Sequence, residues 1–257
     1  MKLQVVRADP AGNITLFVLD PVEKAERPSV ASKLMALEPF AAEQVGFVCA
    51  PEAGFDGCME MAGGEFCGNA SRACGMLLAK QRGMTGKTHL TLRVSGSDRP
   101  VGVDVDADAG TARADMPLPR FADRSVADGV EGVMVDLGGI VHFVVRAEPD
   151  AALMEKVEPL IRPDAEAYGV IFLHDGRMTP LVKVPAAGTL VWEGSCGSGS
   201  LAAAVADSLG TENGAFERDY VQPAGVVRAE LEWKDGSVAA AWIGGSVTLD
   251  ECETVEL

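Results

Sequence analysis

The chain is short of positive charge. Its 257 residues include 22 lysines and arginines against 38 aspartates and glutamates, which gives a formal net charge of −16 at pH 7. A protein of this sign repels phosphate backbones, so we expect no nucleic-acid partner. Long hydrophobic runs are lacking too, because no segment approaches the roughly 20 apolar residues that a membrane-spanning helix needs. Apolar residues still make up 47% of the chain, which is ample for a buried core.

The sequence also lacks the spacing of a metal site. It has no Cys-x-x-Cys pair, and its three histidines, at positions 89, 142 and 174, are scattered. Zinc sites usually show such clustered ligands, so we expect no metal. We expect no secretory signal, because the apolar run at the N-terminus is broken by Arg7. We therefore expect a cytoplasmic protein whose six cysteines are thiols. They are Cys49, Cys58, Cys67, Cys74, Cys196 and Cys252.

Extended segments dominate what is present. Ten segments rich in Val, Leu and Phe, bounded by Gly, Asp, Pro or Asn, are predicted strands. They are Leu3–Val6, Thr15–Leu19, Val45–Cys49, Leu90–Val94, Val101–Val105, Val133–Asp136, Val141–Val145, Val170–Leu173, Leu181–Val184 and Val226–Trp233. Predicted helices are fewer: Pro28–Leu37, Gly68–Gln81, Ala151–Leu160 and Gly197–Leu209. The second and fourth are followed by a glycine, as helix C-termini often are.

The starts of the two stronger helices resemble each other. The segments Cys67–Ala73 and Cys196–Ala202 share the pattern Cys-Gly-(Asn/Ser)-small-Ser-x-Ala, and a glutamate precedes each of them. This weak internal repeat predicts an α/β (α+β) fold of two similar halves, each with one principal helix wrapped in antiparallel or mixed strands. The boundary is expected around Met116–Asp128, where prolines interrupt the pattern.

A cysteine at a helix N-terminus is suited to proton chemistry. Unpaired backbone N–H groups and the positive end of the helix dipole favour the thiolate, which lowers the pKa from its free value of roughly 8.5. The small residues that follow, Gly68 and Asn69 in one helix and Gly197 and Ser198 in the other, let backbone N–H groups approach a substrate carboxylate. Inverting a stereocentre by proton transfer needs a base on one face and an acid on the other. The pair of cysteines therefore predicts racemisation or epimerisation.

Simpler explanations exist for each cysteine. Buried cysteines mostly act as small hydrophobic residues, and we assign that role to Cys49, Cys58, Cys74 and Cys252. A structural disulfide between Cys67 and Cys196 is a further alternative, disfavoured by a reducing compartment. Two matched Cys-Gly helix starts favour the catalytic interpretation of the pair.

These residues resemble the diaminopimelate epimerase superfamily of pyridoxal-independent racemases and epimerases, and the resemblance implies a reaction with no cofactor. Its two motifs, Cys-Gly-Asn-(Gly/Ala)-x-Arg and Cys-Gly-(Ser/Thr)-Gly, match the segments 67–72 and 196–199. The resemblance implies two pseudo-symmetric halves, residues 1–116 completed by a C-terminal strand at 246–257, and residues 117–245, with the active site in the cleft between them. It implies substrate contacts from Asn13 and Gln44, and makes a homodimer possible.

Departures from the family pattern bear on the substrate. Ile140 stands where diaminopimelate epimerases have an asparagine, another such asparagine falls near Tyr168 or Gly169, and Pro185–Thr189 carries no charge where the family has Glu-Arg-Gly. A distal carboxylate would lack its guanidinium partner there, and such contacts are strong and specific. The departures therefore indicate an amino acid with a single α-amino acid end.

The segment Trp192–Cys196 resembles the histidine racemase branch of this superfamily. The resemblance implies interconversion of L- and D-histidine. Glu193 is a candidate for contacting the substrate ammonium or side chain, and the alternative is a solvated acid. Glu65, Tyr168 and Trp192 are further candidates for an imidazole pocket. We expect His142, which stands in the position of a family Pro-His pair, to be a hydrogen-bonded structural residue.

Three alternatives stay open at this point. They are a diaminopimelate epimerase with an altered distal site, an isomerase of substrates other than amino acids, and a non-catalytic binding member of the fold.

Overall fold

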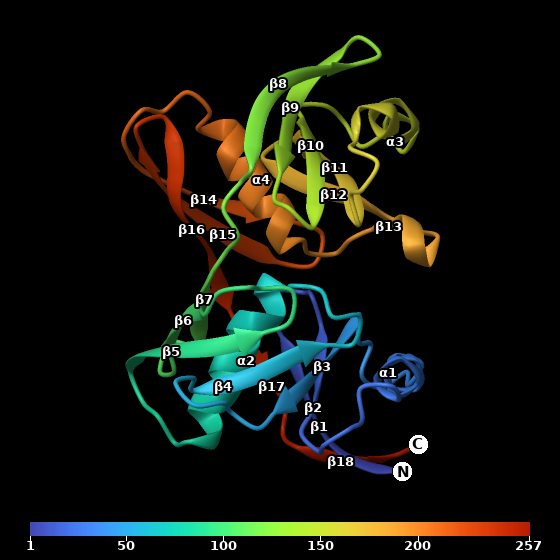
Figure 1. Ribbon diagram of the computed structural model, residues 1–257, viewed down its shortest axis with the longest axis vertical. Helices are drawn as coiled ribbons and strands as arrows, with labels where there is room; N and C mark the ends of the chain where they lie inside the picture. The colour runs from blue at the N-terminus through green and yellow to red at the C-terminus, as the bar shows by residue number, and fades with distance from the viewer. The chain divides into compact units, whose positions relative to one another are not determined.

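The computed structural model describes residues 1–257, which divide into two compact units (Figure 1). The first unit comprises Met1–Asp115 and Gly244–Leu257, and the second comprises Met116–Ile243. The chain thus passes from one unit to the other twice. None of the helices combines the length and the hydrophobicity that crossing a membrane requires.

The first unit is built on a run of strands around one long helix. Strand β1 pairs with β2 antiparallel, β2 with β3 parallel, β3 with β4 antiparallel, β4 with β5 parallel and β5 with β6 antiparallel. Helix α2 connects the parallel neighbours β4 and β5. The elements are β1 (Lys2–Asp9), β2 (Thr15–Val18), α1 (Arg27–Met35), β3 (Gln44–Cys49), β4 (Gly57–Met61), α2 (Gly68–Gln81), β5 (Lys87–Val94), β6 (Val101–Asp106), β7 (Thr111–Asp115), β17 (Thr248–Leu249) and β18 (Glu253–Glu256).

The second unit repeats this alternation of strand directions. Strand β9 pairs with β10 antiparallel, β10 with β11 parallel, β11 with β12 antiparallel, β12 with β14 parallel and β14 with β15 antiparallel. Helix α4 takes the place of α2, between β12 and β14. The elements are β8 (Phe121–Ala127), β9 (Val130–Asp136), β10 (Ile140–Val145), α3 (Ala152–Val157), η1 (Glu158–Leu160), β11 (Ala167–His174), β12 (Arg177–Val184), η2 (Pro185–Ala187), β13 (Thr189–Trp192), α4 (Gly197–Asp207), β14 (Gly214–Val221), β15 (Val226–Lys234) and β16 (Ser237–Ser246), which continues into the first unit.

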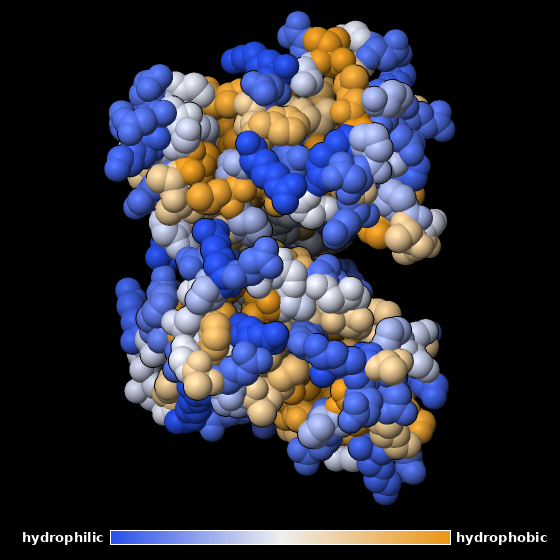
Figure 2. Space-filling view, viewed as in Figure 1, coloured by the Kyte–Doolittle hydropathy of each residue, from blue (hydrophilic) through white to orange (hydrophobic).

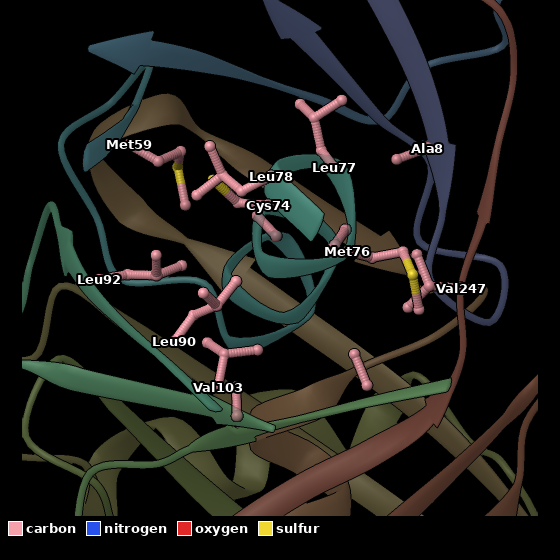
Figure 3. Packing of buried hydrophobic residues seen from close by; sticks show 14 of the residues in the cluster. Ala8, Met59, Cys74, Met76, Leu77, Leu78, Leu90, Leu92, Val103 and Val247 are labelled. Atoms are coloured by element: carbon pink, nitrogen blue, oxygen red, sulfur yellow. The ribbon is translucent and has the colours of Figure 1, made fainter. Parts of the chain in front are cut away.

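Helix α2 is buried along most of its length. Every residue from Gly68 to Ala79 is buried, so the helix is the centre of the first unit and not a surface helix. Strands β5 and β6 alternate buried and partly exposed residues, and their buried side chains face the helix. Figure 3 shows this packing, with Leu90 and Leu92 of β5 and Val103 of β6 beside the helix. The strand pattern thus supplies the apolar shell that holds α2.

The predicted fold class is confirmed: the chain is mixed α/β, mostly strands with four helices. Helix α2 has the predicted bounds, and α1, α3 and α4 lie within a few residues of their predicted ranges. Strands β4, β7, β8, β13, β14 and β16 were not expected from the sequence. Strand β14 is an example of why such strands were missed. Six of its eight residues are exposed, and its sequence carries charges in place of an apolar run.

Exposed apolar side chains gather on β13. Leu190, Val191 and Trp192 are each between 45% and 50% exposed, and hydrophobic surface lies over this strand in Figure 2. A leucine on β13 therefore provides a contrast to the leucines that pack against α2.

We expect Leu90→Ala to lower the free energy of unfolding by about 2–5 kcal/mol, because the side chain is 1% exposed and its loss leaves a cavity against α2. The matched control Leu190→Ala, at 49% exposure, should change it by no more than about 0.5 kcal/mol. Urea unfolding followed by circular dichroism measures both. Equal losses for the two variants would contradict the assignment of Leu90 to the core.

Candidate functional site

Cys67 caps the N-terminus of α2. Its backbone is extended, and its Sγ accepts a hydrogen bond from the Ala70 N–H at 3.4 Å. The Ser71 hydroxyl donates to the Cys67 carbonyl oxygen at 2.7 Å. Small residues after the cysteine allow this close approach of the helix backbone to the sulfur. The thiol therefore lies where N–H groups in the first turn of the helix can stabilise a negative charge.

Polar side chains from β3 and from the segment before β2 surround this thiol. The Gln44 amide donates to Asn13 Oδ1 at 2.7 Å and to Thr15 Oγ1 at 2.8 Å. The parallel register of β2 and β3 places Thr15 opposite Gln44. Gln44 also hydrogen-bonds to the Cys67 thiol, and Asn13 Oδ1 lies 3.9 Å from Cys67 Sγ. The predicted residues Asn13 and Gln44 thus lie together at Cys67.

A glutamate that the sequence did not single out extends this network. The Asn13 amide donates to Glu43 Oε2 at 2.8 Å. Burial raises the pKa of the Glu43 carboxyl, the hydrogen bond from Asn13 opposes that rise, and the negative charge of Asp9 adds to it. The only sequence signal for Glu43 was its position directly before the predicted contact Gln44.

Cys196 caps α4 in the same way. Its Sγ accepts the Gly199 N–H at 3.3 Å, and the Ser200 hydroxyl donates to its carbonyl oxygen at 2.8 Å. The buried side chain of Gln222 makes two hydrogen bonds to this turn. Its Oε1 accepts the Cys196 N–H at 2.7 Å, and its Nε2 donates to Ser200 Oγ at 2.9 Å. Gln222 comes from the end of the β14 hairpin and was missed, because nothing local in the sequence joins it to Cys196.

His142 lies behind Ser198 in this half-site. Its Nε2 is 2.9 Å from Ser198 Oγ, which is 3.5 Å from Cys196 Sγ. Its Nδ1 is buried with no partner. An orphaned buried N–H is rarer than an unused acceptor, so we assign the proton to Nε2, which donates to Ser198. Burial lowers the pKa of His142 to about 3, and the residue is therefore neutral. The expected hydrogen-bonded structural role of His142 agrees with this geometry.

The same strand positions hold different residues in the two units. His142 pairs with Gly169 as Phe17 pairs with Gly46. A Cβ atom on Gly169 would lie 2.9 Å from His142 Nδ1, and one on Gly46 would lie 3.0 Å from the Phe17 ring. Each glycine leaves room for a ring, which is apolar in the first unit and an imidazole in the second.

Burial dominates the ionisation of both thiols. It raises the pKa of Cys67, and hydrogen bonds from the Ala70 N–H and Gln44 oppose that rise, while Glu65 adds to it. It raises the pKa of Cys196 well above its usual range, and the charge of Glu193 and its hydrogen bond to the thiol raise it further. The lowering expected at a helix end is therefore present but is outweighed by desolvation.

Most of the predicted site residues gather around the two cysteines. Asn69 lies in the first turn of α2 with Gly68, and Ser198 in the first turn of α4 with Gly197. Glu193 contacts the Cys196 thiol. Tyr168 does not belong to the set, because it is 4% exposed in a hydrophobic cluster and its hydroxyl donates to Glu158. No group of three or more His, Cys, Asp or Glu side chains has metal-binding geometry.

Comparison with known proteins gives consistent matches. The family model "Histidine racemase CntK N-terminal domain" matches residues 2–251. A histidine racemase of Fusobacterium nucleatum is 31% identical over 78% of this chain and 78% of its own length. A diaminopimelate epimerase of Desulforudis audaxviator is 32% identical over 66% of this chain and 67% of its own. The crystal structure of a Bacillus anthracis phenazine biosynthesis protein of the PhzF family has the same fold, with a TM-score of 0.69 at 16% identity, covering 100% of both chains.

We expect His142 to make the protein less stable in mild acid. Its pKa is near 3 in the folded chain and about 6.5 in an unfolded one, so the unfolded state binds a proton first as the pH falls. This contribution to stability is complete above pH 6.5 and decreases as the pH falls toward 3. Between pH 7.5 and pH 5 the free energy of unfolding should fall by about 2 kcal/mol more in the wild type than in His142→Phe.

Urea unfolding at the two pH values measures this difference, and the variant copies Phe17 at the matching position. The other titrating groups are common to both proteins and cancel in the comparison. An NMR titration in which the His142 imidazole protonates with a midpoint above pH 5 would contradict the assignment.

Proposed function

This chain belongs to the histidine racemase family and is an amino-acid racemase, and we propose that it interconverts L- and D-histidine with Cys67 and Cys196 as the two acid/base groups and no cofactor. The observation that carries this proposal is the matched pair of cysteines that cap α2 and α4. A reaction between mirror-image substrates needs two similar groups that exchange roles with direction, and each unit provides one.

In the proposed reaction one cysteine is a thiolate and the other a thiol. The thiolate takes the α-hydrogen as a proton, and the electron pair of the broken C–H bond passes to the α-carbon and its carboxylate. The thiol then donates its proton to the opposite face, where a new C–H bond forms. One S–H bond has formed and one has broken, so the reverse reaction starts from the cysteines with their roles exchanged.

The helix ends support the anionic intermediate. Backbone N–H groups in the first turn of a helix are unpaired and stabilise negative charge, which is usually a large term in such reactions. Gly68 and Asn69 in α2, and Gly197 and Ser198 in α4, are the residues that we propose contact the substrate carboxylate. Their N–H groups need no reorganisation as charge develops.

The acidic side chains beside the two thiols favour a substrate with N–H groups. Glu43 is linked to Cys67 through Asn13, and Glu193 contacts Cys196 directly. Carboxylates accept hydrogen bonds from an ammonium or an imidazole, but they repel a second carboxylate. Pro185–Thr189 supplies no arginine to neutralise one. Histidine therefore suits this site better than diaminopimelate, which carries a distal carboxylate.

We expect Cys67→Ser and Cys196→Ser each to lower the rate of histidine racemisation, and of α-proton exchange in deuterated water, by at least about a hundredfold. A serine hydroxyl is too weak an acid to replace either thiol at neutral pH. Chiral chromatography and NMR follow the two processes under reducing conditions. The control Cys252→Ser changes an exposed thiol and should leave both rates unchanged. Wild-type exchange rates in both active-site variants would rule out the two-thiol mechanism.

A substrate panel separates histidine racemase from diaminopimelate epimerase. Purified protein is incubated with single L-amino acids and with LL-diaminopimelate. We expect L-histidine to be converted fastest, because the distal carboxylate of diaminopimelate would find no cationic partner in the site. Chiral chromatography measures each product. Faster conversion of LL-diaminopimelate would identify an epimerase with an altered distal site, and no conversion of any amino acid would favour a non-catalytic role.

A further inference from the structure

The two helix starts differ at one buried position. The segments Cys67–Ala73 and Cys196–Ala202 align without a gap, and in both a serine donates to the carbonyl oxygen of the cysteine. Next to that serine the first segment has Arg72 and the second has Leu201, and both side chains are 0% exposed. The same place in the repeat thus holds a cation in one unit and a hydrocarbon in the other.

The Arg72 guanidinium is buried without a carboxylate partner. Its Nε donates to Asn69 Oδ1 at 3.1 Å, one terminal nitrogen to the Ser246 carbonyl oxygen at 2.8 Å, and the other to the Pro10 carbonyl oxygen at 2.8 Å. All three acceptors are neutral. Burying a cation in this way is costly, and burial lowers the pKa of Arg72 to about 10. A charge held at such cost indicates that a negative charge is to be stabilised nearby.

Cys67 is the group that can carry that negative charge. Attraction to Cys67, followed by attraction to Asp9, opposes the effect of burial on the pKa of Arg72. Coulombic attraction is mutual, so the guanidinium also favours the thiolate of Cys67. Hydrogen bonds from the Ala70 N–H and from Gln44 act in the same direction.

Two carboxylates near Cys67 act against its thiolate or lie close to it. Glu65 raises the pKa of the thiol, but its side chain is exposed and its charge is screened by solvent. Glu43 is separated from the sulfur by Asn13, and burial raises the pKa of its carboxyl. The other anion that attracts the buried guanidinium is the half-buried carboxylate of Asp9, and its attraction is smaller than that of Cys67.

Cys196 has the opposite surroundings. The half-buried carboxylate of Glu193 hydrogen-bonds to the thiol and repels a thiolate. His142, which reaches the sulfur through Ser198, is neutral because it is buried. Leu201 replaces the arginine. The environments of the two thiols thus push their ionisation apart, as in other enzymes where paired groups have separate acid and base roles.

We infer that Arg72 is the countercharge of the Cys67 thiolate, so that when the two thiols share one proton, that proton resides on Cys196. Arg72 is a positioning residue, because it touches Asn69 and two backbone carbonyls and acts on the reaction through Cys67. The catalytic meaning of this inference rests on the proposed two-thiol reaction, but the order of ionisation does not.

In the free enzyme Cys67 is then the base and Cys196 the acid. The enantiomer whose α-hydrogen faces Cys67 loses its proton to that thiolate, and Cys196 delivers its own proton to the other face. Product leaves an enzyme with the proton on Cys67 and the thiolate on Cys196. Proton exchange with water returns it to the resting form.

Alkylation without substrate tests the order of ionisation. Full-length protein is treated with iodoacetamide between about pH 5 and pH 10, and peptide mass spectrometry gives the rate at each cysteine. Only the thiolate reacts, so the midpoint of each profile reports ionisation even where access differs. The exposed thiol of Cys252 is the internal reference. We expect Cys67 to have a lower midpoint than Cys196.

Variants that exchange the two environments make the test specific. Arg72→Leu copies Leu201 of the second unit and should raise the Cys67 midpoint by at least one pH unit, which is about a tenfold loss of alkylation at a fixed pH below it. Arg72→Lys keeps the charge and should restore most of the shift, which a purely structural role would not do. Glu193→Gln should lower the Cys196 midpoint and leave Cys67 unchanged.

An unchanged Cys67 midpoint in folded Arg72→Leu would overturn the inference, as would a wild-type protein in which Cys196 ionises first. If circular dichroism shows that Arg72→Leu is unfolded, two other measurements test the inference: the order in which the thiols of the wild type ionise, and the Cys67 midpoint in Arg72→Lys. A Cys67 midpoint as high as that of Cys196 in Arg72→Lys would also refute the role of Arg72 as countercharge. Racemisation is assayed separately. A protein with the expected order that racemises no amino acid refutes the proposed function alone, and an active racemase with the reversed order refutes this inference alone.

Discussion

At both cysteines the sulfur accepts a hydrogen bond from a backbone N–H in the first turn of the helix that it caps, at 3.4 Å for Cys67 and 3.3 Å for Cys196. This contact opposes desolvation, which favours the neutral thiol in a buried place. Neither effect alone gives a useful acid/base group, because an exposed thiol would be hydrated and a buried one without donors would not ionise. The chemistry proposed for each cysteine therefore depends on keeping the helix end fixed against the sulfur.

The strand order of each unit provides that fixed helix end. In both units the helix lies in the chain between two parallel neighbouring strands, and a short loop after a strand, β4 or β13, leads into its N-terminus. The first unit adds Arg72, which ties the start of α2 to the carbonyl oxygens of Pro10 and Ser246. The second unit adds Gln222, which ties the Cys196 backbone to Ser200. Different side chains thus perform the same mechanical task.

The sequence predicted what is encoded locally. Helices α2 and α4 follow from small residues, a cysteine cap and a glycine stop, and the two cysteines follow from the repeated motif. It did not predict contacts made across the chain: Gln222 is 26 residues from Cys196, and Ser246 is 174 residues from Arg72. Strand β14 escaped prediction for a related reason, since its pairing with β15 and not an apolar pattern defines it. Local patterns locate the thiols, and long-range packing decides their surroundings.

The unequal surroundings of the two thiols are compatible with a reaction whose equilibrium constant is one. Two enantiomers have the same free energy in water, so no arrangement of Arg72 and Glu193 can favour one product at equilibrium. Such charges change only which protonation form of the free enzyme is populated. They therefore determine which enantiomer binds with its α-hydrogen facing a thiolate. Two thiols in identical surroundings would divide the free enzyme equally between two protonation forms, and each form could deprotonate only one enantiomer. In the proposed reaction, a cation beside Cys67 and a carboxylate beside Cys196 concentrate the free enzyme in one of these forms.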